Sequence, residues 1–105
     1  MATLNLVRLL CLKTEDYGKD EAYLVVNGKK FWGPFKMGVG QSSSINRSFD
    51  FTNFIEIKLF DSDGKFDSDD YLGTINVTSA LKDQGEQIGS FRRDGASYNL
   101  YYNVV

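Results

Sequence analysis

The sequence predicts an all-β protein, an antiparallel β-sandwich of seven to eight strands that forms one domain over residues 1–105. Three observations predict this fold class. Short runs of alternating apolar and polar residues recur about every ten residues, which is typical of the strands of a sandwich. Turn signals separate the runs, among them Asn27-Gly28 and Asp94-Gly95. Six tyrosines and eight phenylalanines suit pleated, half-buried surfaces.

The first predicted strand covers residues 3–13. Its apolar side chains start on one face, with Leu4 and Leu6, and then occupy both faces. Such a pattern has two explanations, because the strand either is covered on both sides or contains a β-bulge.

A hairpin is predicted next. Residues 22–27 lead into Asn27-Gly28, a dipeptide that favours the tight turn between two antiparallel strands. The return strand, residues 29–32, is predicted to end at Gly33-Pro34, because proline lacks the backbone N–H that a sheet uses.

The remaining strands follow a glycine- and serine-rich connection, residues 37–44. Residues 54–60 alternate most regularly, with Ile55, Ile57 and Leu59 on one face. A short helical turn is predicted within residues 78–86. The other strands are predicted at residues 45–51, 71–77, 87–92 and 96–105.

The composition excludes several classes of function. Without histidine, the chain has no Ser-His or Cys-His nucleophilic site and no zinc site of the usual kind. Catalysis by a carboxylate pair remains open in principle, but nothing suggests a substrate cleft, so we expect a protein that is not an enzyme. The net charge of -2 gives no sign of the positively charged surface that binds nucleic acid.

The single cysteine, Cys11, lies within an apolar run and is expected in the core. A lone thiol forms no internal disulfide, which fits a reducing compartment. The sequence shows neither a signal peptide nor an apolar stretch long enough to span a bilayer. We therefore expect a cytoplasmic protein.

Acidic residues are concentrated in two segments, each directly after an apolar strand. These segments hold nine of the fourteen acidic residues against two lysines, whereas the rest of the chain has five acidic and ten basic residues. The nine are Glu15, Asp16, Asp20 and Glu21 in the first segment and Asp61, Asp63, Asp67, Asp69 and Asp70 in the second. If the two preceding strands occupy matching positions in the sandwich, both loops emerge at one end of the molecule.

Carboxylates gathered in this way repel one another, by about 4 kcal/mol for two unit charges about 4 Å apart at an effective dielectric constant near 20. A hard divalent cation removes the repulsion. Calcium accepts about six to eight oxygen ligands in a tolerant geometry, whereas magnesium prefers a strict octahedron with retained waters. An EF-hand is rejected, because its glycine and glutamate positions, counted from Asp61, hold Phe66 and Leu72. The alternative is that the acids only keep the surface solvated.

These residues resemble the C2 domain family, the calcium-dependent membrane-binding β-sandwiches found in protein kinase C and synaptotagmins. The first loop of that family reads approximately D-x-x-G-x-S-D-P-Y-V-x-V, and residues 15–26 read E-D-Y-G-K-D-E-A-Y-L-V-V. The third loop of the family reads approximately D-x-D and then D-x-[IL]-G. Residues 61–73 supply Asp61, Asp63 and the run D-Y-L-G. The resemblance covers residues 4–77.

The resemblance implies which acids bind calcium. By position they are Glu15 or Asp16, Glu21, Asp61, Asp63 and Asp70, with Asp20, Asp67 and Asp69 as supporting candidates. It also implies the circularly permuted, type II strand order, because the first acidic loop follows the first strand and a full strand closes the chain.

The resemblance further implies docking to anionic phospholipid when calcium is bound. Tyr17 and Phe66 lie among the acids and are candidates for membrane contact, although either ring could instead cover its own loop. Lys29, Lys30 and Lys36 are candidates for a phosphate or lipid site, the alternative being solvated hairpin lysines. The expected partners are calcium ions and an anionic membrane, with peripheral localisation. The alternative is a calcium sensor, a buffer or a module with a protein partner.

Overall fold

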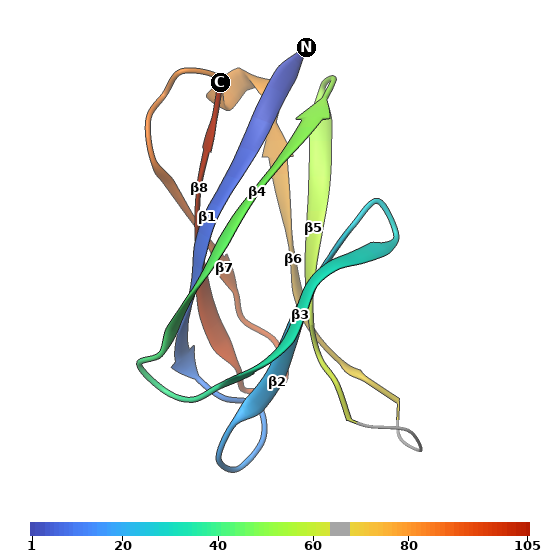
Figure 1. The fold of residues 1–105 in the computed structure, drawn as a ribbon, viewed down its shortest axis with the longest axis vertical. Coiled ribbons are helices and arrows are strands. Elements are labelled where there is room, and N and C mark those ends of the chain that lie inside the picture. Colours follow the sequence, from blue (N-terminus) through green and yellow to red (C-terminus); the bar gives the residue numbers. More distant parts are fainter. Residues whose placement is uncertain (64–67) are drawn as a thin grey trace.

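The computed structural model describes residues 1–63 and 68–105 and confirms the predicted all-β sandwich. Eight strands form two four-stranded antiparallel sheets, in the orders β4-β1-β8-β7 and β3-β2-β5-β6 (Figure 1). The first sheet contains β1 (Ala2–Lys13), β4 (Ser42–Phe51), β7 (Gln87–Phe91) and β8 (Ser97–Val104). The second sheet contains β2 (Asp20–Val26), β3 (Lys29–Met37), β5 (Phe54–Asp61) and β6 (Asp70–Thr78).

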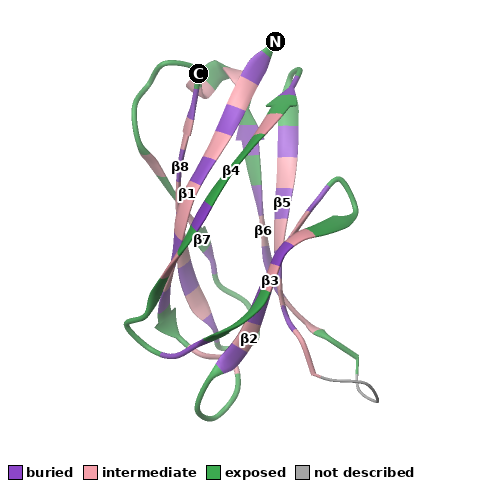
Figure 2. Ribbon diagram, in the orientation of Figure 1, coloured by how far each residue is buried: buried purple, intermediate pink, exposed green. Residues whose placement is uncertain are grey.

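The core lies between the two sheets, and buried residues alternate with more exposed ones along most strands (Figure 2). The predicted inward face of β5, formed by Ile55, Ile57 and Leu59, is buried. Full burial of one such side chain stabilises the fold by about 1.5–3 kcal/mol. A register slip of one residue would expose the whole face, so this alternation fixes the pairing of β5 with its neighbours. On β8 the buried residues are Tyr98, Leu100, Tyr102 and Val104.

A β-bulge in β1 explains its mixed pattern of apolar residues. The pairing of β1 with both β4 and β8 shifts register between Leu6 and Arg8. Because of this shift, Leu6 before the bulge and Leu9 and Cys11 after it all point into the core. Of the two explanations that the sequence left open, the bulge is correct, and the predicted burial of Cys11 is confirmed.

Both predicted hairpin turns are present. Asn27 and Gly28 have φ angles of 53° and 76°, and Asp94 and Gly95 have φ angles of 52° and 82°. Two successive positive φ values are the geometry that joins twisted antiparallel strands.

The predicted end of the return strand at Gly33-Pro34 is wrong, because β3 continues to Met37. The register of β3 against β2 shifts at this point, with Ala22 opposite Phe35 and Leu24 opposite Trp32. Gly33 has a φ angle of 88°, and a Cβ there would collide with the carbonyl oxygen of Ala22. Strand β3 therefore continues past Pro34 by means of a β-bulge at Gly33, a position that only glycine fits.

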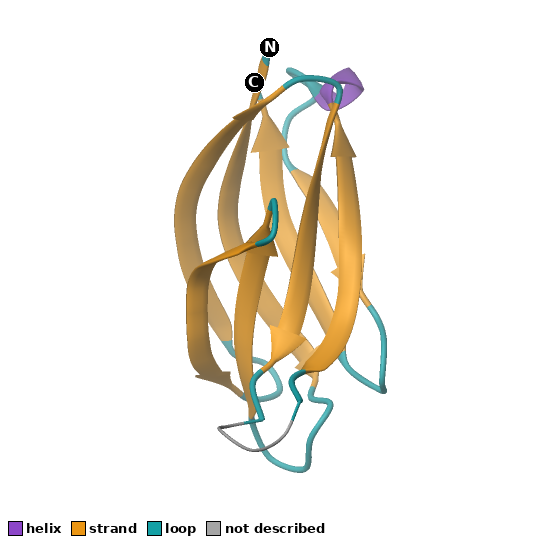
Figure 3. Cartoon of the chain, turned by 90° about the vertical axis from the view of Figure 1, so that its right-hand side faces the viewer, coloured by secondary structure: helices purple, strands orange, loops and turns teal. Residues whose placement is uncertain are grey.

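Both chain ends lie at one end of the sandwich, and the acidic loops lie at the other (Figure 3). Thr3 and Val105 exchange two backbone hydrogen bonds of 2.8 and 2.9 Å, which extend the pairing of β8 with β1 in the middle of the first sheet. This pairing and an acidic loop directly after β1 agree with the type II strand order. The predicted helical turn in residues 78–86 is a single 3-10 turn, η1 (Ser79–Leu81), near the chain ends.

Candidate metal centre

The two acidic loops are neighbours because of strand pairing. The first joins β1 to β2 and the second joins β5 to β6. Since β2 pairs with β5 in antiparallel order, Ala22 near the start of β2 lies opposite Asp61 at the end of β5. Asp61 in turn lies opposite Asp70 at the start of β6. We call this end of the sandwich, with its loops, the acidic end.

Four carboxyl groups meet there. Glu15, Asp16, Asp61 and Asp70 each offer one oxygen atom, and these oxygens all lie within 4.8 Å of one another. Asp16 is exposed, Glu15 and Asp70 are partly buried, and Asp61 is buried with 1% of its surface accessible. We refer to these four residues as the acidic cluster.

Two oxygens of the acidic cluster are buried without a partner. Asp61 Oδ1 accepts a hydrogen bond of 2.7 Å from the backbone N–H of Glu21. Asp61 Oδ2 and Glu15 Oε2 have no hydrogen-bond partner among the described residues. A buried polar atom without a partner costs about 1–3 kcal/mol, and more if the group is charged. The donor set of hard carboxylate oxygens, two of them unused, fits a calcium ion.

The pKa values in the acidic cluster reflect the same crowding. Burial raises the pKa of Asp61 from 3.8 to about 8, and so does the neighbouring Asp16 carboxylate, which favours the protonated form of Asp61. Burial and the neighbouring Asp16 raise the pKa of Glu15 to about 7. The pKa of Asp16 itself is lowered, chiefly because a protonated Asp61 can donate a hydrogen bond to its carboxylate. Near neutral pH the raised pKa values of Asp61 and Glu15 therefore favour bound protons that a cation can displace.

Asp20 is not a member of the acidic cluster. Its carboxyl group is fully buried and accepts hydrogen bonds from the backbone N–H groups of Glu15, at 2.9 and 3.1 Å, and Asp16, at 3.0 Å. The hydroxyl of Tyr98 on β8 also donates to it, at 2.6 Å. Asp20 thus ties the first acidic loop to the opposite sheet and sets the backbone that carries two members of the cluster.

The other acids take different positions around the cluster. Asp63 follows Asp61 by two residues and is not one of the four carboxyls of the cluster, but the neighbouring Asp70 raises its pKa to about 6. Asp69 accepts hydrogen bonds from the hydroxyl of Tyr23 and, at 3.2 Å, from the backbone N–H of Asp63. Glu21 is partly buried. Its backbone N–H donates to Asp61 Oδ1, and its carbonyl oxygen accepts a hydrogen bond from the backbone N–H of Ser62. The candidates Asp67 and Phe66 lie outside the described residues.

Apolar side chains project from two loops of the acidic end. Tyr17, at the tip of the first acidic loop, is fully exposed. Val39, in the β3–β4 loop, is 67% exposed, and hydrogen bonds of 2.8 and 2.9 Å join this loop to Cys11 near the end of β1. Val39 is not among the membrane-contact residues predicted from the sequence. The signal that could have found it is an apolar residue between two glycines, Gly38 and Gly40, in a connection between strands.

Two of the three candidate lysines line one groove. Lys29 and Lys30 lie beside Arg47 in a hollow of about 560 Å³ between the β2–β3 hairpin and β4. Arg47 was also missed, since a lone arginine on an edge strand carries no sequence signal. Lys36 is separate, opposite Glu21 in the pairing of β2 with β3.

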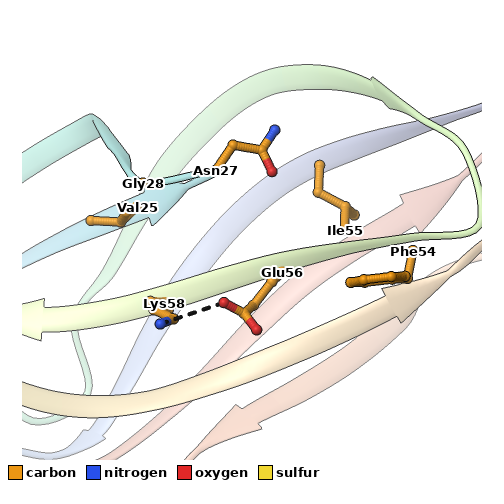
Figure 4. A pocket seen from close by; sticks show the side chains of 7 residues that line it. All are labelled: Val25, Asn27, Gly28, Phe54, Ile55, Glu56 and Lys58. Atoms are coloured by element: carbon orange, nitrogen blue, oxygen red, sulfur yellow. Dashed lines mark ion pairs between the residues drawn. The ribbon is translucent and has the colours of Figure 1, made fainter.

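A second hollow, of about 360 Å³, lies between the β2–β3 hairpin and the start of β5 (Figure 4). The charged residues that line it, Glu56 and Lys58, form an ion pair of 3.5 Å with each other. The hollow therefore offers little unbalanced charge, and we assign no function to it.

Solved structures share this fold. One described as the structure of a C2 domain matches with a TM-score of 0.60 and 14% identity, over 98% of this chain and 96% of that chain. The C2A and C2B domains of extended-synaptotagmin 2 match with a TM-score of 0.60 and 17% identity, over 98% of this chain and 40% of that chain. Human GIVD cytosolic phospholipase A2 matches with a TM-score of 0.57 and 14% identity, over 98% of this chain and 16% of that chain.

No protein-family model matches the sequence, and no curated protein matches it at a significant level. Within the described residues, no helix has the length and apolar character needed to cross a bilayer. The similar structures have low sequence identity and agree with this chain in architecture over nearly its whole length. The protein therefore has the fold of a C2 domain.

Proposed function

We propose that this protein is a non-enzymatic calcium-binding module that docks onto anionic phospholipid membranes when calcium is bound. The observation that carries the proposal is the buried carboxyl of Asp61, a member of the acidic cluster whose Oδ2 has no partner among the described residues. A protein that folds around such a group gains stability if a cation satisfies it. The similarity to C2 structures supports the same function.

The residues proposed to hold calcium are Glu15, Asp16, Asp61 and Asp70, with Asp63 beside them. Asp20 acts through the backbone of the first acidic loop, where it fixes Glu15 and Asp16. When bound, calcium supplies positive charge and coordination positions for the phosphate oxygens of lipid. Without it, the carboxylates repel an anionic surface.

Two measurements test the proposal. Calorimetric titration should show calcium binding, and sedimentation with phosphatidylserine-containing vesicles should depend on calcium and disappear with chelator. No heat and no rise in melting temperature at saturating calcium would contradict the metal site. Calcium binding without vesicle binding would instead indicate a sensor, a buffer or a module with a protein partner.

The exposed apolar residues of the acidic end should contribute to membrane affinity. Tyr17→Ala and Val39→Ala should each weaken calcium-dependent vesicle binding by roughly tenfold, because each removes apolar surface that enters the interface, worth about 1–2 kcal/mol. Calcium affinity without vesicles should not change. Phe54→Ala is the matched control, since Phe54 is 63% exposed at the opposite end of the sandwich, on β5. If Phe54→Ala weakens vesicle binding as much as the other two variants, the proposed docking through the acidic end is wrong.

Stability without metal should depend on pH. A carboxyl whose pKa rises on folding, such as Asp61 from 3.8 to about 8, contributes stability that is complete below the lower value and lost as pH rises toward the upper one. In chelator, the melting temperature should therefore fall between about pH 5 and about pH 8, by on the order of 10 °C or more. Calcium should raise the melting temperature more at the higher pH. If calcium raises the melting temperature by the same amount across this pH range, calcium does not displace protons from these carboxyls.

A further inference from the structure

A pocket of about 350 Å³ lies where the edge strands of the two sheets meet, β6 from one and β7 from the other. Two glycines let the edges approach. A Cβ on Gly73 would lie 3.3 Å from Phe91, and one on Gly89 would lie 2.7 Å from the side chain of Ile75. The pocket is therefore a consequence of how the sandwich closes along this side.

The lining of this pocket is rich in hydrogen-bond donors. β6 contributes Tyr71 and Thr74, and β7 contributes Ser90, so three hydroxyl groups lie at its wall. The turn after β7 adds two guanidinium groups, those of Arg92 and Arg93. We call these five residues, together with Gly73, the arginine pocket. Its lining contains no carboxylate among the described residues.

Both guanidinium groups are held by neutral partners. Arg92 Nη1 donates a hydrogen bond of 2.6 Å to the hydroxyl of Ser97. The Arg93 guanidinium lies 5.1 Å from the centre of the Tyr71 ring, a cation–π contact that orients it over the pocket wall. Within residues 1–63 and 68–105, neither guanidinium forms an ion pair. Their positive charge is therefore not offset by a paired carboxylate in the described part of the chain.

The arginine pocket lies at the acidic end. The β7–β8 turn that carries both arginines lies at the same end of the sandwich as the acidic loops (Figure 1). Tyr98, near the start of β8, donates its hydrogen bond to Asp20 of the first acidic loop. On the other side, Tyr71 directly follows Asp70 of the acidic cluster. A surface that meets the acidic end can therefore also reach this pocket.

We propose that the arginine pocket binds a phosphate monoester group. A monoester carries about -1.5 to -2 charges at pH 7, which two guanidinium groups match, and its oxygens accept the paired donors of arginine. Among the three hydroxyls, Ser90 donates to Asn99, and Tyr71 and Thr74 share one hydrogen bond, so one hydroxyl proton has no partner among the described residues and can serve as a further donor. The pocket volume is at the small end of ligand sites, which suits a head group rather than a large molecule.

The test is a titration of the whole chain with inorganic phosphate, in chelator and at constant ionic strength, followed by amide chemical shifts. We expect saturable shifts at Gly73, Thr74, Ser90, Arg92 and Arg93. The double variant Arg92→Gln/Arg93→Gln should bind phosphate about tenfold or more weakly, because it loses two charged donors. The control is Lys82→Gln, which removes an exposed cation near the chain ends, outside the lining of the arginine pocket, and should leave the affinity unchanged.

Vesicles distinguish the two sources of the phosphate group. In chelator, and at an ionic strength that screens the repulsion between the acidic loops and the membrane, phosphatidylcholine vesicles with added phosphatidic acid should sediment the protein if the ligand is a lipid head group, and the arginine variant should stay in solution. Binding of phosphate without binding of these vesicles assigns the site to a soluble phosphate ester. Absence of saturable shifts, or equal affinity in the arginine variant with an otherwise native spectrum, overturns the proposal. Because calcium is absent throughout, these outcomes are independent of the proposed metal site.

Discussion

Asp61→Asn should weaken calcium binding about 100-fold while the protein stays folded. Asp61 is the buried member of the acidic cluster, and its Oδ2 has no other partner among the described residues. Removing one full negative charge at ligand distance from a divalent ion should weaken binding on the order of 100-fold, about 2.7 kcal/mol. Calorimetric titration measures this directly. In chelator near pH 8 the variant should melt at a higher temperature than the parent, since it no longer buries an ionisable carboxyl.

The matched control is Asp83→Asn, the same change of side chain at an exposed site near the chain ends. Asp83 has a φ angle of 61°, a conformation that asparagine tolerates well, so the fold is not expected to suffer. Calcium affinity should equal that of the parent. The double variant Asp61→Asn/Asp63→Asn should also fold and bind no calcium. Parent-like affinity in either Asp61 variant means that the ion binds elsewhere.

Asp20→Ala should have the largest effect on stability. The change leaves the buried hydroxyl of Tyr98 and the backbone N–H groups of Glu15 and Asp16 without their acceptor. A buried donor that loses its partner costs about 1–3 kcal/mol, so we expect a loss of about 3 kcal/mol in the free energy of unfolding. Denaturant unfolding in chelator measures it. Calcium affinity should fall as well, because the loop that carries Glu15 and Asp16 loses its attachment to β8.

Two variants separate the parts of this effect. Asp20→Asn keeps one acceptor oxygen and should cost less than the alanine change. Tyr98→Phe removes only the hydroxyl and should destabilise the fold by about 1 kcal/mol with little effect on calcium binding. An alanine variant as stable as the parent would show that the Asp20 carboxyl does not hold the loop.

The sheets were predictable from sequence because their signals are local. The alternation of β5 and β8 follows from burial of one face, and the Asn27-Gly28 and Asp94-Gly95 turns follow from backbone sterics. The continuation of β3 through Gly33 was not predictable in this way. It depends on the close approach of β2 to Gly33, and the sequence around Pro34 does not indicate how near another strand will lie.

The candidate site was predictable as a region but not as a set of ligands. Asp20 and Asp61 are the same residue type, each beside an acidic loop, yet one faces Tyr98 and the other faces the cluster. Which way each side chain points depends on the packing of the opposite sheet. Val39 and Arg47 lie in segments without an acidic signal. They became candidates for ligand contact only because the fold exposes Val39 at the acidic end and places Arg47 beside Lys29 and Lys30.

The pairing of β1 with β8 has a practical consequence for experiments on surfaces. Both chain ends lie beside each other at the end of the sandwich opposite the acidic loops (Figure 1). The sandwich measures 40 Å along its longest axis. A tether attached at either terminus therefore leaves the acidic end pointing outward, where vesicles or soluble ligands in a flow cell can reach it without obstruction by the support.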